Sequence, residues 1–459
     1  MTIVLLVLVL YVGLQLALGV WVSRRVSSQQ DYLLGGRSLG LVLCGASMFA
    51  TWFGAETCVG AAGEVYQHGL GAISADPFGY GVCLILFGLF IAAELRRRGY
   101  TTLADLFGDR FSPLVERLVA LILLPGSVLW AAAQIRAFGQ VFAAASDGLD
   151  PALGVTLAAG VTLLYTASGG LLADVYTDLL QGVVLVVTLL ALAVITVSMV
   201  GSLDALLARA NVSAGDELGG LERLNDWAVP IAGSLFTQEV ISRAVASRTT
   251  QIARRAALLA GVVYLVLGTI PVLLGLLARQ VLPHTVDSEQ VLPLLSRHLF
   301  GEVGFVVLAG TLVSAILSTV DSCLLACGAL IMQNLVGARA RDLSDRARLR
   351  LTRLSVVGLG ALAYVLALTG TSVHGLVEES SALGSAGLFV AGLLGLYTRF
   401  GGARAALLSL GLGGVTYIYA EHVLASGVAY LASLGGAVLG YALGTLWDER
   451  PAAAANQAS

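Results

Sequence analysis

Long apolar runs separated by short charged loops make up this chain from end to end. About thirteen of them are long enough for a helix to cross a bilayer, which takes about 20 apolar residues. These predicted spans cover residues 2–22, 40–66, 70–94, 113–145, 151–168, 174–200, 227–246, 253–280, 302–336, 351–370, 374–398, 403–421 and 426–447. The pattern predicts an all-α integral membrane protein with about thirteen transmembrane helices.

Basic residues gather on one side of these predicted spans. Arginine clusters follow the first, third, seventh and ninth spans, within residues 24–37, 96–110, 243–255 and 339–353. Because basic loops remain on the cytoplasmic side, we expect an external N-terminus and a cytoplasmic C-terminus. We expect a multi-pass protein of the bacterial plasma (inner) membrane, with a disordered cytoplasmic tail at 451–459. A composition of 57% hydrophobic and 12% charged residues excludes a soluble globular domain.

Two of the predicted spans carry helix-breaking and polar residues near their centres. Residues 51–60 read TWFGAETCVG, and residues 229–239 read VPIAGSLFTQE. Irregular backbone at membrane depth is tolerated where it lines an enclosed cavity, and its free carbonyls and amides bind ions and solutes there. Two interrupted helices in corresponding positions indicate an inverted-repeat transporter with a site at the bilayer midplane. The alternative is a pair of kinks that only serve helix packing.

A third polar segment lies at residues 312–326, LVSAILSTVDSCLLA. It places Ser318, Thr319, Asp321 and Ser322 in an otherwise apolar span, where ionisable groups usually face a cavity or an ion path. Hydroxyl and carboxylate oxygens are hard ligands that suit a hard cation. The alternative for the hydroxyls is a bond back to the carbonyl four residues earlier.

Several motifs together resemble the sodium/solute symporter family over residues 40–447. They are DYLLGGRSLG at 31–40, FATWFGAET at 49–57, RRGYTTLADLF at 97–107, LYTASGGLLADVYTDLLQG at 164–182, QEVISRAVASR at 238–248 and SAILSTVDS at 314–322. The resemblance implies the leucine-transporter fold, with two inverted five-helix repeats and two discontinuous helices. It divides a single transporter domain, 1–450, into a leading helix and loop (1–36), a core (37–400) and two trailing helices (401–450).

The same resemblance implies a set of ion ligands. The sodium site would use the backbone carbonyls of Ala50, Phe53 and Ala315 with the hydroxyls of Ser318 and Thr319, and Na⁺ would be the coupling ion. A candidate second cation site comprises Asp178, Asp321 and Ser322. In members that bind a second ion, serine often stands where this chain has Asp321. Asp178 and Asp321 therefore hold a second sodium, hold a proton, or form a polar network.

The candidate substrate residues are acidic, aromatic or polar. They are Trp52, Glu56, Thr57, Asp76, Tyr80, Trp130, Gln238, Glu239 and Glu378. Only Arg136 offers a positive charge clearly within a core span, so a cation or an amine-bearing solute is favoured over a carboxylate, and aromatic faces attract ammonium groups. The motifs at 50–52, 78–81 and 129–133 are most similar to those of the high-affinity choline transporter branch. Its aromatic residue in the seventh span corresponds to Thr237 or Phe236 here. The alternative role for each aromatic residue is core packing.

These observations predict a sodium-coupled secondary active symporter that imports a small organic solute by alternating access. The expected solute is cationic or amine-bearing, such as choline, betaine or an amino acid, and the protein is expected to function as a monomer. The alternatives are proton coupling, a neutral solute such as a sugar, a carboxylate solute, or a membrane sensor module. An enzyme is not indicated, because the sequence contains no nucleotide-binding loop, nucleophile–base spacing or metal cluster.

Overall fold

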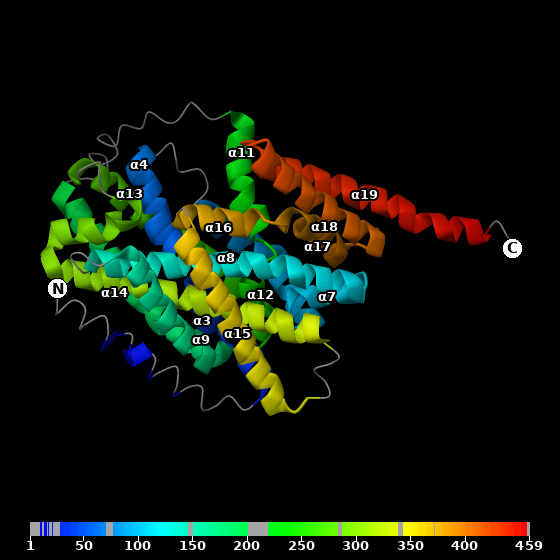
Figure 1. Ribbon diagram of the computed structural model, residues 1–459, viewed down its shortest axis with the longest axis horizontal. Helices are drawn as coiled ribbons and strands as arrows, with labels where there is room; N and C mark the ends of the chain where they lie inside the picture. The colour runs from blue at the N-terminus through cyan, green and yellow to red at the C-terminus, as the bar shows by residue number, and fades with distance from the viewer. Residues whose placement is uncertain are drawn as a thin grey trace.

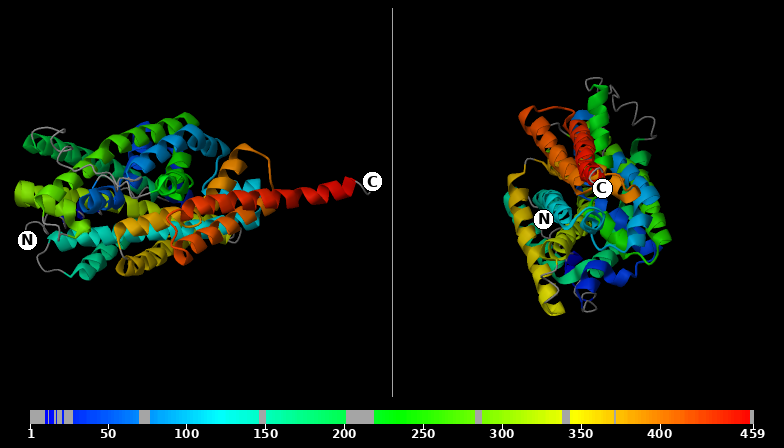
Figure 2. Two further views of the ribbon diagram at one scale, coloured as in Figure 1. Left: turned by 90° about the horizontal axis from the view of Figure 1, so that it is seen from above. Right: turned by 90° about the vertical axis from the view of Figure 1, so that its right-hand side faces the viewer.

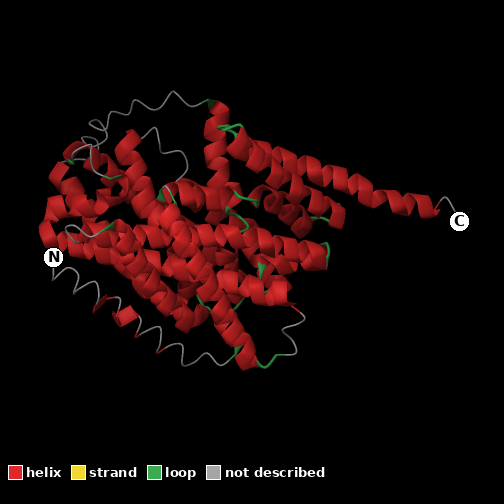
Figure 3. Cartoon of the chain, viewed as in Figure 1, coloured by secondary structure: helices red, strands yellow, loops and turns green. Residues whose placement is uncertain are grey.

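The structure is a computed structural model that describes residues 28–69, 77–145, 150–200, 219–282, 287–337, 343–370 and 372–456. It also describes residues 10, 11, 13–15, 17 and 21 within the leading segment. Most of the predicted first span, 2–22, and the candidate Asp76 lie outside the described residues. Within the described part, the chain is helical, and its one β-bridge pairs Leu39 with Ser247 (Figure 3).

The helices follow one another with short connections. The first half contains α2 (Gln29–Leu34), α3 (Leu41–Trp52), η2 (Glu56–Gly60), α4 (Ala61–His68), α5 (Phe78–Leu86), η4 (Phe87–Ile91), α6 (Ala92–Arg98), α7 (Leu103–Arg110), α8 (Pro113–Ala145) and α9 (Pro151–Val200). The second half contains α11 (Gly220–Ala228), η5 (Val229–Gly233), α12 (Gln238–Ala246), α13 (Thr250–Val281), η6 (Ser288–Gln290), α14 (Val291–Leu330), η7 (Ile331–Val336), α15 (Asp345–Thr369), α16 (Val373–Ala382), α17 (Ser385–Tyr397), α18 (Ala403–Ile418), η9 (Tyr419–Val423) and α19 (Ala429–Asn456).

Among the described residues, seven helices are long and apolar enough to cross a membrane, or nine when two bent pairs are each counted as one span. The predicted spans 151–168 and 174–200 form α9, which turns at Gly170 in the left-handed region (φ 74°) that glycine adopts without strain. Helix α19 continues to Asn456, into the segment for which the sequence predicts disorder. The total of thirteen spans stays a prediction.

Helix α14 forms the centre of the molecule. Its membrane-spanning part is 72% buried, whereas that of α15, which lies across the outside of the bundle, is only 28% buried (Figure 1). Helices α8 and α9 pack on α14 and on each other, and α13 packs on α3, α4 and α5. Helices α17, α18 and α19 pack together as a separate group on one side of the bundle (Figure 2). Any polar side chain on the inner face of α14 is therefore enclosed by protein.

The first predicted interruption is present between α3 and η2. Helix α3 ends at Trp52, and the chain axis bends by 51° before α4. The backbone groups freed by the break are bonded by side chains from two other helices. Tyr264 of α13 donates to the Trp52 carbonyl at 3.1 Å, and Ala55 N donates to Gln134 Oε1 of α8 at 2.9 Å. The break is thus stabilised inside the protein, as backbone at membrane depth requires.

The second predicted interruption separates η5 from α12. Thr237 has extended backbone (φ −80°, ψ 141°), and its N–H donates to the Ser234 carbonyl at 3.3 Å. The Ser234 hydroxyl donates to Ser381 Oγ at 3.3 Å, which ties the break to α16. Both interrupted helices that the sequence predicts are therefore confirmed.

Candidate functional site

Three aromatic side chains meet beside the first interruption. The rings of Trp52 and Trp130 stack with an interplanar angle of 19° and centroids 6.1 Å apart. Tyr80 packs edge-on against both, at 5.8 Å from Trp52 and 5.7 Å from Trp130. We call this set, Trp52, Tyr80 and Trp130, the aromatic triad; all three side chains are at most 3% exposed. Residues far apart in the sequence, on α3, α5 and α8, therefore form one closed cluster.

The two indole N–H groups of the triad are unusual. Both nitrogens are buried, and within the described structure neither Trp52 Nε1 nor Trp130 Nε1 has a hydrogen-bond partner. Buried polar groups are ordinarily paired, because an unpaired donor costs about 1–3 kcal/mol. By contrast, the Tyr80 hydroxyl lies 3.0 Å from Ser381 Oγ. The triad therefore offers two donors that suit an acceptor atom on a bound solute.

Glu56 lies at the start of η2, fully buried. Gln134 Nε2 donates to Glu56 Oε2 at 2.8 Å, and the amide of Gly54 donates to Glu56 Oε1 at 3.4 Å. Neither donor carries a formal charge. The Glu56 carboxylate is therefore held by neutral hydrogen bonds, which makes it available as the counter-charge of a cation.

Thr319 connects the middle of α14 to the first interruption. Its hydroxyl donates to the Ala315 carbonyl at 3.0 Å and lies 3.5 Å from the Ala50 carbonyl. The structure thus brings together three of the five ligands expected for sodium, from α3 and α14. The hydroxyl of Ser318 donates to Asp178 Oδ1. Because a hydroxyl that donates its proton keeps its oxygen lone pairs, both side chains remain able to bind a cation.

Asp178 belongs to a buried charge cluster around Arg243. The Ser47 hydroxyl donates to Asp178 Oδ2 at 2.5 Å, and Arg243 Nη2 lies 3.9 Å from the same oxygen. Arg243 also donates to Asp174 and to the Ser322 hydroxyl. Both Arg243 and Asp174 are fully buried. The sequence counts Arg243 among the cytoplasmic arginines, and that interpretation is wrong: a guanidinium lies within the core.

This cluster alters the expected second cation site. Ser322 donates to Asp174 Oδ2 at 3.3 Å and to the Ser318 carbonyl at 2.8 Å. The hydrogen bonds of Asp178 go to Ser47 and Ser318, not to Asp321. Asp321 is 2% exposed, and its Oδ1 atom is buried without a hydrogen-bond partner among the described residues. Asp178 and Ser322 therefore share the Arg243 cluster, whereas Asp321 keeps an unpaired oxygen.

The other candidate substrate residues do not meet the triad. Gln238 accepts from the amide of Leu103 at 2.7 Å and donates to Ser242 at 3.0 Å, so its amide joins α12 to α7. The side chain of Glu378 is 52% exposed and lies 3.9 Å from His374 Nε2. The Thr57 hydroxyl lies 2.5 Å from the Tyr264 hydroxyl, which already caps Trp52. These three side chains have structural partners of their own.

Arg136, the one cation that the sequence places in the core, is also engaged elsewhere. It donates to Glu289 Oε2 at 3.1 Å and to the Gly370 carbonyl at 3.0 Å. Glu289 in turn accepts from the amide of Val373 at 2.6 Å. Arg136 therefore ties η6 to α8 and to the start of α16.

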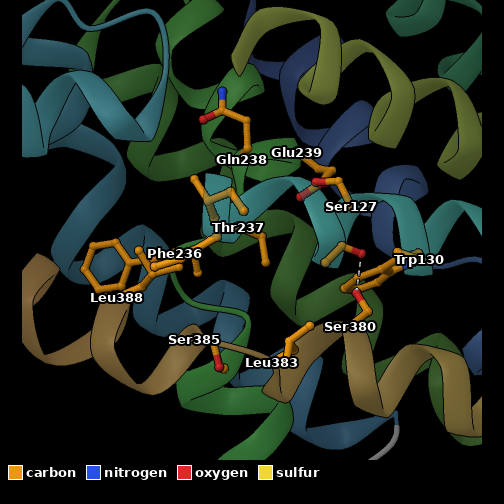
Figure 4. Close-up of a pocket in the computed structure, with 14 residues that line it drawn as sticks. Ser127, Trp130, Phe236, Thr237, Gln238, Glu239, Ser380, Leu383, Ser385 and Leu388 are labelled. Atoms are coloured by element: carbon orange, nitrogen blue, oxygen red, sulfur yellow. Dashed lines mark hydrogen bonds between the residues drawn. The ribbon is translucent and has the colours of Figure 1, made fainter. Parts of the chain in front are cut away.

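A small cavity adjoins the triad at the second interruption (Figure 4). Trp130, Ser127, Thr237, Glu239 and Ser380 line it, and Glu239 accepts from the Ser127 hydroxyl at 2.5 Å. The Gln238 side chain points away from Trp130 in the same view. The volume of about 30 Å³ holds one or two water molecules, so a larger solute needs the helices to separate. The Phe236 ring instead faces Phe389, with centroids 6.4 Å apart.

Sequence reasoning missed Gln134, Tyr264, Asp174 and Arg243. Each is a polar side chain within an apolar segment, the one signal by which it could have been found. Gln134 follows Trp130 by one helical turn, which places both on one face of α8.

Comparison with known proteins gives consistent matches along the chain. The model of the sodium:solute symporter family matches residues 32–413. The high-affinity choline transporter 1 of Drosophila melanogaster is 29% identical over 403 residues, which cover 82% of this chain and 64% of that protein. The chain thus spans slightly under two thirds of that relative's length. A high-affinity proline transporter of Bacillus subtilis is 25% identical over 88% of this chain and 89% of its own length.

A solved structure also matches along the whole chain. It is that of a Na⁺-coupled sialic acid symporter in a substrate-bound, outward-open state, with a TM-score of 0.80. The match covers 97% of this chain and 96% of that one at 16% identity. The likeness shows a common helical membrane fold.

Proposed function

The chain belongs to the sodium:solute symporter family, and we propose that it couples sodium entry to the import of a small, choline-like cation. The expected solute carries a quaternary or primary ammonium group together with a hydroxyl or carboxylate oxygen. The bacterial plasma membrane is the proposed location, with the N-terminus outside and the C-terminus in the cytoplasm.

The observation that carries this proposal is the aromatic triad beside a buried carboxylate. Aromatic faces attract a desolvated ammonium group with about 2 kcal/mol each. The two unpaired indole N–H groups suit the oxygen of choline or betaine. Glu56 supplies the opposite charge, while Arg243 is bonded to Asp174 and lies near Asp178 in a separate cluster. A small ammonium compound satisfies all of these groups together.

Sodium binding is proposed at Thr319, Ser318 and the carbonyls of Ala50, Phe53 and Ala315. Three of these ligands already lie close together, and the proton of each hydroxyl is donated to another oxygen. Lone pairs of both hydroxyls can therefore face a hard cation. Bound sodium would fix the backbone at the break, which also positions Glu56 and Trp52. Ion binding would thereby complete the substrate site, and this is the proposed basis of coupling.

A role in ion coupling is also proposed for the group of buried aspartates. Three aspartates, Asp174, Asp178 and Asp321, lie close to one arginine, Arg243. One guanidinium cannot balance three ionised carboxylates, so the remaining charge favours a proton or a second sodium. The unpaired oxygen of Asp321 is the proposed position for that ion.

The proposal is tested by ligand binding to the purified protein. Choline and its neutral isostere, in which carbon replaces the ammonium nitrogen, are compared in a thermal-shift or calorimetric titration with sodium or potassium. We expect sodium-dependent binding of choline and at least tenfold weaker binding of the isostere. In Glu56→Gln this preference should shrink, because only the cation loses a charged partner. The exposed Glu378→Gln variant serves as the control and should keep the preference.

Two results would direct the assignment elsewhere. Equal binding of choline and the isostere would assign Glu56 to hydrogen bonding with a neutral solute such as a sugar. Binding that depends on pH but not on sodium would indicate proton coupling instead.

A further inference from the structure

A second cavity lies on the outside of the bundle, distant from the charged cluster. It is a groove of about 290 Å³ between α3, α9 and α13. Val42, Gly45 and Phe49 line it from α3, Gly182 and Val183 from α9, and Leu259 from α13. Every lining residue is apolar or glycine. The volume is nearly twice that of a cavity of about 150 Å³ that takes up benzene.

The rim of this groove is continuous with the surface that faces the bilayer. Val42 is 65% exposed, Val183 53% and Leu259 48%, and all three lie on helices that pass the test for a membrane span or a bent span. Exposed apolar side chains on a spanning helix contact hydrocarbon, since water is absent at that depth. The groove is therefore open to lipid.

We propose that one acyl chain of a membrane phospholipid occupies this α3–α9–α13 groove. Gly182 forms part of its floor: it is buried, yet a Cβ atom at this position would find nothing within 4 Å. A flexible hydrocarbon chain fills such a space and gains the dispersion contacts that an empty groove lacks. The leading segment contacts a different part of α9, because Gln181 donates to Gln15 at 2.5 Å.

The acyl chain would lie against the helix that carries proposed ion ligands. Phe49, 4% exposed, lines the groove and precedes Ala50 in the sequence. Its ring lies 4.8 Å from that of Phe53 and 6.3 Å from that of Tyr264. An acyl chain packed on Phe49 therefore stabilises the position of α3 relative to α13. Binding of the acyl chain does not depend on the proposed solute or on sodium.

The test uses the full-length protein in liposomes that contain a phosphatidylcholine with a diazirine in one acyl chain. After photolysis, mass spectrometry locates the labelled peptides. We expect labelling of residues 42–49 and 179–187 to exceed that of the exposed lipid face of α15 several-fold. Gly182→Leu fills the groove and should remove this excess. Gly160→Leu, on an exposed face of the same helix with nothing within 4 Å, should leave it unchanged.

Thermal unfolding of both leucine variants shows whether each retains the fold. Labelling of the groove no stronger than that of α15, or unchanged labelling in a folded Gly182→Leu variant, would overturn the proposal. So would an intermolecular disulfide formed by Gly182→Cys, because a second copy would then cover the groove. The native cysteines 44, 58, 83, 323 and 327 are all buried, so they do not interfere with this arm.

Discussion

Gly54, in the break of the first interrupted helix, lies directly against Thr319 of α14. A Cβ atom at position 54 would be 2.7 Å from the Thr319 hydroxyl oxygen and 2.8 Å from Gln134 Oε1. Thr319 is a proposed sodium ligand, and Gln134 holds Glu56. One backbone position therefore joins the proposed ion site to the proposed counter-charge of the solute.

This contact predicts that Gly54→Ala weakens sodium binding. The added methyl group must displace Thr319 or Gln134, since real Cβ atoms do not approach other atoms so closely. We expect at least a tenfold rise in the sodium concentration that half-maximally stabilises the protein in a thermal titration. Gly160→Ala, which meets no atom within 4 Å, is the matched control. Wild-type sodium dependence in Gly54→Ala would show that the ion lies elsewhere.

Removal of either hydroxyl from the proposed ion site should also weaken sodium binding. Ser318→Ala and Thr319→Ala each delete one of few oxygen ligands, a loss of about 1.5–3 kcal/mol for a group bonded to a charge. Such a loss corresponds to a shift of roughly tenfold or more in the half-saturating sodium concentration. Thr319→Ser keeps the oxygen and should retain most of the affinity. If both alanine variants titrate like wild type, these hydroxyls serve only the helix backbone.

The two interrupted helices could be predicted from sequence because their cause is local. Gly54 follows Phe53 in the first break, and Pro230 with Gly233 precede the second, where helix propensity fails within an apolar run. The meeting of Trp52, Tyr80 and Trp130 could be expected only from family resemblance. They lie on three helices, and no periodicity within one helix determines how three helices face one another.

The role of Arg243 could not be predicted for a different reason. It lies at the end of an interrupted span, close to Arg248, and the orientation rule assigns both to the cytoplasmic side. In the structure the two differ: Arg248 is exposed and donates to the Ser38 carbonyl, whereas Arg243 is fully buried. Only the packing of α12 against α3, α9 and α14 distinguishes them. Similarly, the exposure of Glu378 depends on the bend between α16 and α17.

The buried pair of Arg243 and Asp174 gives a prediction about stability. Arg243→Gln leaves two neighbouring carboxylates without their cation, and breaking a buried pair costs about 3–5 kcal/mol. We expect a large fall in the midpoint of thermal unfolding, and partial recovery in the double variant Arg243→Gln/Asp174→Asn. Arg248→Ala, on the exposed surface, should change the midpoint little. A midpoint equal to that of wild type in Arg243→Gln would mean that the aspartates carry protons in the folded protein.

Asp321 allows a test of the proposed second ion. Asp321→Asn removes the charge but keeps the shape of a side chain whose Oδ1 atom has no described hydrogen-bond partner. If a proton or a second sodium binds there, the variant should change the ion-to-solute ratio or the pH dependence of uptake into proteoliposomes. Solute binding itself should remain measurable. Unchanged coupling would assign Asp321 to polar packing between helices.

The triad predicts a difference between two substitutions of Trp52. Its ring stacks on Trp130 and packs against Tyr80, so Trp52→Ala removes one face of the proposed ammonium site. The loss of one desolvated cation–π contact, about 2 kcal/mol, corresponds to roughly thirtyfold weaker binding of choline. Trp52→Phe keeps an aromatic face and should bind choline within a few-fold of wild type.

Comparison with the neutral isostere of choline separates the charge effect from a loss of packing. Trp52→Ala should weaken the cation by more than the isostere, because only the cation interacts with the ring quadrupole. Trp447→Ala provides the control, since that indole is 56% exposed and lies near Arg404 at the end of a span. If Trp52→Ala weakens both ligands equally while its thermal unfolding stays normal, the triad encloses the solute by shape. The ammonium selectivity would then rest on Glu56 alone.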